Sequence, residues 1–249
     1  MKLMKALLKT VFYVPLYNGL VFLLGVLPGD SAGAAVILLT LFIKVLLSPL
    51  SYRAAKFQIE MRAHEPELNR LKEKFKNDKQ AQGRAVLEFY REKGVNPLAG
   101  IFPIFIQIPI VIALYYVFAN GGLPAIDASL LYPFISVPDV DMDFLGIDIG
   151  GKSFILAILV GITQLFQGHL AMPPQKQRST TPSFQEDLAR GMHIQMKYVL
   201  PVFIAFVAYA ASGAVALYFI TSNLFTIGQE LYLRKLFKKQ GHLTHSATH

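Results

Sequence analysis

The sequence predicts an all-α polytopic membrane protein. Of its 249 residues 53% are hydrophobic, and Cys and Trp are absent. Five apolar segments, long enough or nearly long enough to cross a hydrocarbon core of about 30 Å, alternate with polar loops whose charge changes sign. This pattern is typical of integral membrane proteins and not of soluble domains. The absence of Cys also excludes disulfides and thiol chemistry.

The apolar segments set the expected transmembrane spans, which cover about 34–50, 101–119, 154–170, 198–211 and 214–228. The last two flank Ser212-Gly213, which is typical of a tight turn and predicts a helical hairpin. An earlier segment, 11–27, is interrupted by Pro15 and Gly19 and fits either an interfacial helix or a sixth span. The expected division is therefore an N-terminal helix in 1–30 and a membrane core in 31–249.

The loop charges predict the orientation of the spans. Loop 51–96 is rich in Lys and Arg, whereas 120–151 contains Asp residues and neither Lys nor Arg. Basic loops remain on the cytoplasmic side of a membrane. Loop 51–96 and the basic tail 230–249 are therefore expected in the cytoplasm, together with the C-terminus, and the acidic loop outside.

Loop 51–96 carries the pattern of a helical hairpin rather than of a simple connector. Pro66 is expected to kink or restart its first helix, Asp78 suits a turn and an N-cap, and Gly94 suits a C-cap. Apolar residues recur at roughly helical spacing in both arms: Phe57, Met61, Leu68, Leu71 and Phe75 in the first, and Ala85, Val86, Phe89 and Tyr90 in the second.

Lys44 is the most informative single residue, because it lies near the middle of the first span. An ammonium group there costs several kcal/mol unless it faces water or a partner, and no Asp or Glu occurs in any apolar segment. Its side chain reaches about 6 Å, while the cytoplasmic end of the span is about 10 Å away, so snorkelling does not fully explain it. The remaining hypothesis is a polar groove inside the helix bundle.

Polar residues at helical spacing on four spans support this hypothesis. Thr40, Lys44 and Ser48 share one face of the first span. The other expected groove residues are Gln107 on the second span, Gln164 on the third, and Tyr218 and Ser222 on the fifth, with Asn223 and Thr226 beside that face. Ser, Thr and Gln also stabilise their own or neighbouring helices, so each stripe alone is weak evidence.

No pattern in the sequence indicates catalysis. Nucleophile–base arrangements, phosphate-binding Gly loops and metal motifs are absent from the sequence, so we expect no enzyme, cofactor or metal site. His242, His245 and His249 lie in a polar tail for which an unstructured tail is the simpler interpretation.

Three segments nevertheless resemble one family. FIKVLLSPLSYRAAKFQIEM, GVNPLAGIFPIFIQIPIVIALYYVF and SGAVALYFITSNLFTIGQ are similar in order and spacing to motifs of the YidC family of membrane-protein insertases. The resemblance covers about 18–234 and implies a five-helix core with a groove open to the cytoplasm and the lipid. It also implies a cytoplasmic hairpin and an N-terminal interfacial helix. Lys44 stands where the family has a groove arginine, and Phe219 where it often has a second tyrosine.

The resemblance implies a function, a location and partners. The expected protein is an insertase and chaperone of the bacterial inner membrane that moves short membrane proteins from the cytoplasm into the bilayer. Its expected partners are nascent membrane proteins and lipids, with a ribosome and a protein translocon as further partners and no nucleic-acid readout. Two alternatives stay open: a small-molecule or ion transporter that uses Lys44, and a scaffold whose hairpin recruits other proteins.

Overall fold

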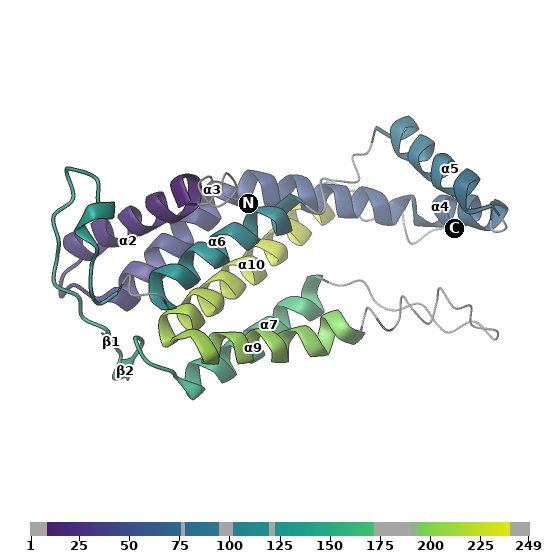
Figure 1. Cartoon of the computed structure of the whole chain (residues 1–249). Coiled ribbons are helices and arrows are strands. Elements are labelled where there is room, and N and C mark those ends of the chain that lie inside the picture. The colour runs from purple at the N-terminus through teal and green to yellow at the C-terminus, as the bar shows by residue number, and fades with distance from the viewer. Residues whose placement is uncertain are drawn as a thin grey trace. The chain divides into compact units, whose positions relative to one another are not determined.

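The computed structural model describes residues 9–75, 78–94, 102–119, 123–171, 191 and 194–239. These residues are mostly helical, which confirms the predicted all-α class (Figure 1). The chain forms two units. Unit 1 comprises Met1–Val45 and Pro109–Gln229, and unit 2 comprises Leu46–Ile108 and Glu230–His249. Three helices contribute to both units: α3 (Ala32–Ala63), α6 (Phe102–Ala119) and α10 (Gly213–Lys239).

In unit 1 the N-terminal helix packs against the first half of α3. The π-helical turn η1 (Lys9–Tyr13) continues directly into α2 (Val14–Val26). The chain then reverses at Gly29 and Asp30, which both have positive φ, of 78° and 47°. A Cβ on Gly19 would lie 3.2 Å from Leu39 Cδ1, so α2 and α3 approach closely there. The apolar side chains of α2 that are fully buried are Tyr17, Leu20, Val21 and Leu24.

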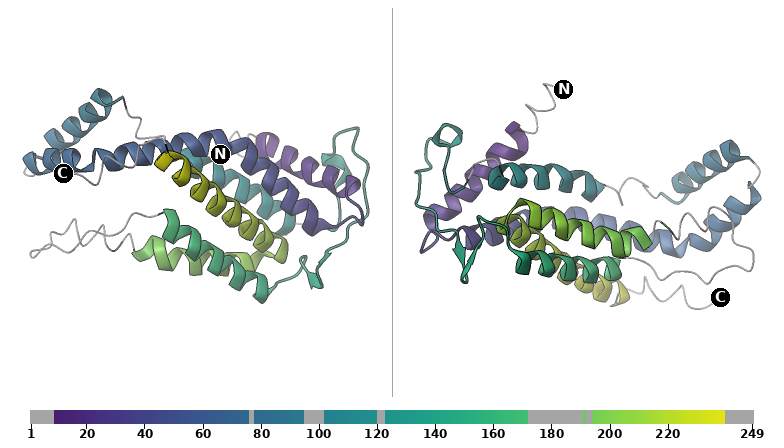
Figure 2. Two further views of the ribbon diagram at one scale, coloured as in Figure 1. Left: turned by 180° about the vertical axis from the view of Figure 1, so that it is seen from behind. Right: turned by 60° about the horizontal axis from the view of Figure 1, so that its bottom comes forward.

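Two further helices of unit 1 lie side by side (Figures 1 and 2). These are α7 (Phe154–Ala171) and α9 (Leu200–Ala211), the latter preceded by the π-helical turn η4 (Gln195–Val199). Gly161 on α7 permits close packing, since a Cβ there would lie 3.4 Å from that of Ala205. Large apolar side chains remain exposed on both helices, namely Phe154, Ile155, Phe166, Val202, Phe203 and Phe206. Such apolar patches mark contact with lipid or with a partner.

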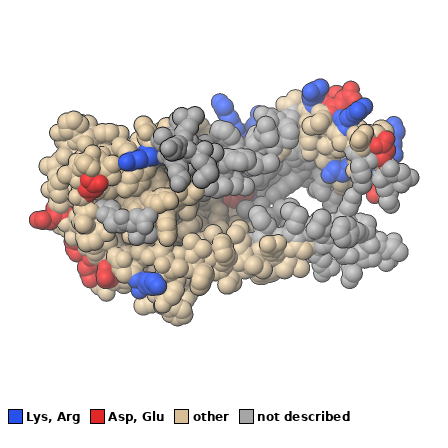
Figure 3. All heavy atoms as spheres, in the orientation of Figure 1, with Lys and Arg blue, Asp and Glu red and all other residues tan. Residues whose placement is uncertain are grey.

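The segment 123–153, called the acidic loop below, joins α6 to α7. It contains the short 3-10 helix η3 (Ala128–Leu130) and a two-stranded hairpin of β1 (Asp143–Phe144) and β2 (Ile147–Asp148). Leu145 and Gly146 have φ of 57° and 78°, as the two-residue turn of such a hairpin requires. Acidic side chains gather on this part of unit 1, while the visible surface of α7 and α9 is uncharged over most of its length (Figure 3).

In unit 2, α4 (Glu65–Lys74) and α5 (Lys79–Glu92) pack against each other as a helical hairpin within the segment 51–96. That this segment forms a cytoplasmic hairpin stays a prediction. Helix α3 continues beyond the predicted span and ends at Ala63, and α4 restarts with Pro66 in its first turn, where a missing N–H costs little. The Asp78 carboxylate accepts hydrogen bonds from Gln80 N and Ala81 N, both at 3.0 Å, which confirms the predicted N-cap. Gly94 has φ of 63° just after α5, as a C-cap glycine does.

The predicted break at Ser212-Gly213 is also confirmed. Helix α9 ends at Ala211 and α10 begins at Gly213, with Ser212 in an extended conformation between them. By length and hydropathy, two described helical stretches could cross a membrane, Lys9–Val26 and Ala32–Phe57. Pro109–Phe118, Phe154–Leu170 and Lys197–Ala211 are apolar but shorter. The span bounds, and the division between 1–30 and 31–249, stay predictions.

Candidate functional site

Lys44 contacts a polar face of α10 within unit 1. Its Nζ donates a hydrogen bond of 3.2 Å to Thr226 Oγ1, and that hydroxyl donates to the Ser222 carbonyl at 2.8 Å. The Lys44 side chain is half-buried, and among the described residues no acidic side chain forms an ion pair with it. The ammonium group is therefore held by a neutral hydroxyl.

The same face of α10 also reaches α7. Asn223 Nδ2 donates a hydrogen bond of 3.1 Å to Thr163 Oγ1, and the Thr163 hydroxyl lies within 3.0 Å of the carbonyl oxygens of Leu159 and Val160 on its own helix. Thr226 is the third residue after Asn223, so the two side chains lie about 60° apart around the helix. One polar strip of α10 thus faces α7 on one side and α3 on the other.

Three of the residues expected in the groove lie in the interior of unit 1. Thr40 and Tyr218 are each 2% exposed, and Ser222 is also buried. The Thr40 hydroxyl donates to Val36 O at 2.6 Å, and the Tyr218 ring packs edge-on against Phe219 at 5.3 Å. Thr40 therefore satisfies its polar group within its own helix, as Thr in an apolar helix commonly does.

The remaining expected residues are spread over other elements. Gln164 lies half-buried on α7, next to Thr163. Ser48 is half-buried on the part of α3 that belongs to unit 2. Gln107 belongs to α6, but its side chain lies outside the described residues. That all seven residues line one groove stays a prediction.

The structure adds three residues to the site that were not among the predicted groove residues, namely Asn223, Thr226 and Thr163. Thr226 follows Ser222 by one helical turn, so its position beside the predicted face was the available signal. The sequence offered little to predict Thr163, which is a polar residue next to Gln164. One turn further along α7, the buried Gln167 Oε1 accepts no hydrogen bond from the described residues.

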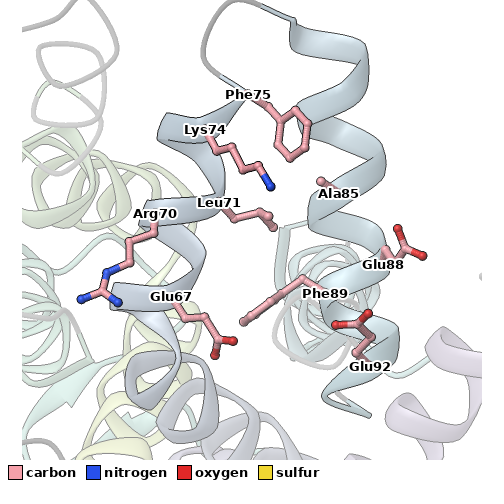
Figure 4. Close-up of a pocket in the computed structure, with 9 residues that line it drawn as sticks. All are labelled: Glu67, Arg70, Leu71, Lys74, Phe75, Ala85, Glu88, Phe89 and Glu92. Carbon is pink, nitrogen blue, oxygen red and sulfur yellow. The ribbon is translucent and has the colours of Figure 1, made fainter.

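Unit 2 holds a separate cleft, of about 450 Å³, between α4 and α5 (Figure 4). Its floor is apolar, formed by Leu71, Phe75 and Phe89. Charged side chains border it on both sides, namely Glu67, Arg70 and Lys74 of α4 and Glu88 and Glu92 of α5. The cleft is amphipathic, with charges of both signs on the α4 side and acidic groups on the α5 side.

One ion pair closes the base of this hairpin. Lys93 Nζ lies 2.9 Å from Glu67 Oε2, and the hydrogen bond from Lys93 lowers the pKa of the Glu67 carboxyl. His64 packs edge-on against Phe89 at 6.0 Å.

A second lowered pKa belongs to Asp127 in the acidic loop, because Ser129 donates hydrogen bonds to its carboxylate. All these groups lie outside the predicted spans.

Comparison with known proteins identifies the family. The family model described as "60Kd inner membrane protein" matches residues 23–240. Several proteins named "Membrane protein insertase YidC" are similar to most of this chain. The one from Fusobacterium nucleatum is 32% identical over 203 residues, which cover 82% of this chain and 86% of that protein.

Two further relatives carry the same name. The protein from Clostridium tetani is 30% identical over 213 residues, covering 85% of this chain and 86% of its own length. The protein from Oceanobacillus iheyensis is 31% identical over 231 residues, covering 91% of this chain and 83% of its own. The predicted resemblance is thereby confirmed, and the chain belongs to the 60Kd inner membrane protein family, which includes YidC.

Proposed function

We propose that this protein is a membrane-protein insertase and chaperone that moves short membrane proteins from the cytoplasm into the bilayer. The observation that carries the proposal is Lys44, a half-buried cation on an apolar helix whose described partner is the neutral hydroxyl of Thr226. The names of the relatives support the same activity. The transporter alternative has no comparable support, because no second ionisable side chain accompanies Lys44 in the described contacts of unit 1.

The proposed architecture has five spans: α3, α6, α7, η4 with α9, and α10. The hairpin of α4 and α5 and the C-terminus then lie in the cytoplasm, and the acidic loop lies outside, as the charge of these segments favours. The N-terminal helix is assigned to the outer interface. Tyr17 and Asn18 of α2 hydrogen-bond the backbone of the acidic loop at Asp127, Leu130 and Tyr132. The polar backbone of an irregular, acidic loop belongs in the membrane interface and not in the hydrocarbon core.

The proposed groove uses the polar strip of α10 and Lys44 together. An acidic or polar flank of a nascent segment enters from the cytoplasm and is attracted by the Lys44 ammonium. Hydroxyl and amide groups such as those of Thr226 and Asn223 then offer partners at mid-membrane depth, which lowers the cost of moving polar groups through lipid. The apolar part of the segment leaves sideways into the bilayer, driven by its burial at about 25 cal/mol per Å².

The hairpin supplies a first contact in this proposal. Its amphipathic cleft can receive an apolar segment at Phe75 and Phe89 while the charged walls contact its flanks. Basic residues on the hairpin also suit anionic head groups, at roughly 1 kcal/mol for each nearby Lys or Arg. A ribosome and a protein translocon are proposed as further partners on this cytoplasmic side.

Insertion into reconstituted vesicles tests the function. Lys44→Arg is expected to keep insertion, while Lys44→Ala and Lys44→Glu are expected to impair insertion of substrates with acidic flanks more than of substrates with neutral flanks. Lys152→Ala is the matched control, because Lys152 is an exposed lysine of the acidic loop. If Lys44→Glu inserts acidic-flank substrates as well as the parent protein, the electrostatic mechanism is wrong. If the parent protein inserts no substrate at all, the function itself is wrong.

A further inference from the structure

The two helices that carry Lys44 and Thr226 begin on the same stretch of backbone. At the start of α3, Ala32 N donates to Asp141 O at 2.9 Å, and Asp141 N donates to Asp30 O at 3.0 Å. At the start of α10, Ala214 N donates to Ile149 O at 2.8 Å and Gly213 N to Gly151 O at 2.7 Å. Ile149 N in turn donates to Met142 O at 2.9 Å, beside Asp141. The segment 141–151, called the clasp below, therefore ties the two helix starts together.

Lys44 and Thr226 lie equally far along their helices from these hydrogen bonds. Lys44 follows Ala32 by 12 residues, and Thr226 follows Ala214 by 12 residues. At a rise of 1.5 Å per residue, each arm is about 18 Å long. Helices α3 and α10 both lead away from the clasp, so a shift of one against the other would separate the side chains that now meet at 3.2 Å.

Close contacts fix both ends of the clasp. A Cβ on Gly213 would lie 2.8 Å from Ile149 Cα and 3.2 Å from Ile149 O, which are backbone atoms that no side-chain rotation can move. A Cβ on Gly33 would collide with the Phe144 side chain. The Ile149 side chain is fully buried. Glycine at these two positions therefore lets the helix starts lie directly on the clasp.

We propose that Thr226 is the positioning residue for the Lys44 ammonium and that the clasp sets the register of α3 against α10 which brings the two together. Thr226 suits this role because its hydroxyl accepts from Lys44 while donating to Ser222 O. The consequence for insertion rests on the proposed function, whereas the register itself does not.

Disulfide cross-linking tests the register without any insertion assay. The chain has no Cys, so every cross-link reports an introduced pair. Thr40 and Ser222 each precede Lys44 and Thr226 by four residues, so the proposed register puts Thr40→Cys and Ser222→Cys at one level. This pair is expected to cross-link, and Thr40→Cys with Thr226→Cys, about one helical turn out of register, is expected to cross-link several-fold less. The reverse preference would overturn the register.

A substitution at the helix start that contacts the clasp supplies a second test. Gly213→Val, which places side-chain atoms against Ile149, is expected to reduce the cross-linking of the Thr40→Cys/Ser222→Cys pair several-fold. Gly228→Val is the matched control on the same helix, since nothing lies within 4 Å of a Cβ there. Equal cross-linking in the two variants would overturn the role of the clasp. If Gly213→Val yields no folded protein, Gly33→Ala is measured instead, with the same two outcomes.

The role of Thr226 is tested by spectroscopy and by insertion. The resonance of ¹³C-dimethylated Lys44, assigned by its absence in Lys44→Arg, is expected to move in Thr226→Val and to remain in Thr226→Ser, which keeps the hydroxyl. Insertion of acidic-flank substrates is expected to fall about tenfold in Thr226→Val, as the loss of one hydrogen bond to a charged group predicts. If Lys44→Ala impairs insertion but Thr226→Val matches the parent in both readouts, Thr226 does not position Lys44. If Lys44→Ala has no effect, the proposed mechanism fails instead.

Discussion

Asn18 holds the N-terminal helix to the acidic loop, and its substitution should release that contact. Its side chain is 1% exposed. Nδ2 donates to Leu130 O at 2.8 Å, and Oδ1 accepts from Tyr132 N at 2.6 Å. Asn18→Leu keeps the branching of the side chain and leaves both backbone groups unpaired. At about 1–2 kcal/mol for each partly buried group, the loss is roughly 2–4 kcal/mol. For a chain of this size the melting temperature should fall by roughly 4–16 °C.

Thermal unfolding in detergent, followed by far-UV circular dichroism, measures this change. Thr10→Val is the control, because Thr10 is an exposed polar residue on the same N-terminal helix. Cleavage at the loop aspartates by an Asp-specific protease supplies a local readout and should become faster in Asn18→Leu alone. A melting temperature within 1 °C of the parent, together with unchanged cleavage, would refute the view that Asn18 anchors the loop.

Three further predictions concern the hairpin of α4 and α5. Asp78→Ala removes the cap of α5 and should destabilise that helix by about 1 kcal/mol, seen as faster hydrogen exchange in 79–92 and not in α7. The pKa of Glu67 is lowered chiefly by the hydrogen bond from Lys93, so its stabilising effect is complete above the ordinary value of 4.5 and is lost as pH falls through the lowered pKa. The protection factors of the hairpin amides, which are corrected for the slower intrinsic exchange at low pH, should therefore fall on acidification in the parent. Lys93→Met should weaken that dependence, and an identical pH profile in both would contradict it. Deletion of 65–92 should reduce insertion into vesicles, and undiminished insertion would leave the hairpin a connector.

The sequence predicted those features that depend on local chemistry. Apolar runs gave the helices, and Pro66, Asp78 and Gly94 marked the limits of α4 and α5 because each acts through its own backbone or the next turn. Lys44 stood out for the same reason, since a charge in an apolar run is visible without knowledge of its neighbours. The break at Ser212-Gly213 follows from the turn preference of that dipeptide.

The contacts between distant segments could not be predicted in this way. Asn18 and Tyr132 are separated by 114 positions, and their bond joins a side chain to a backbone N–H that every residue type presents. The clasp binds the start of α10 through backbone hydrogen bonds from Gly213 and Ala214 to Gly151 and Ile149, which leave almost no signature in a single sequence. Thr163 was missed because a threonine in an apolar helix more commonly bonds its own carbonyls, and here it does that and also accepts from Asn223.

The position of Lys44 around α3 explains why its partner lies on α10. Phe42 is 66% exposed, and Lys44, two residues later, lies about 200° around the helix, on nearly the opposite side. The exposed apolar face and the charged side chain of α3 are thus separated by helical geometry alone. On α10 the first two turns, from Gly213 to Phe219, are wholly buried. The Lys44 side chain, turned away from the exposed face of α3, therefore contacts α10. The polar side chains of α10 that reach α7 and α3 are Asn223 and Thr226.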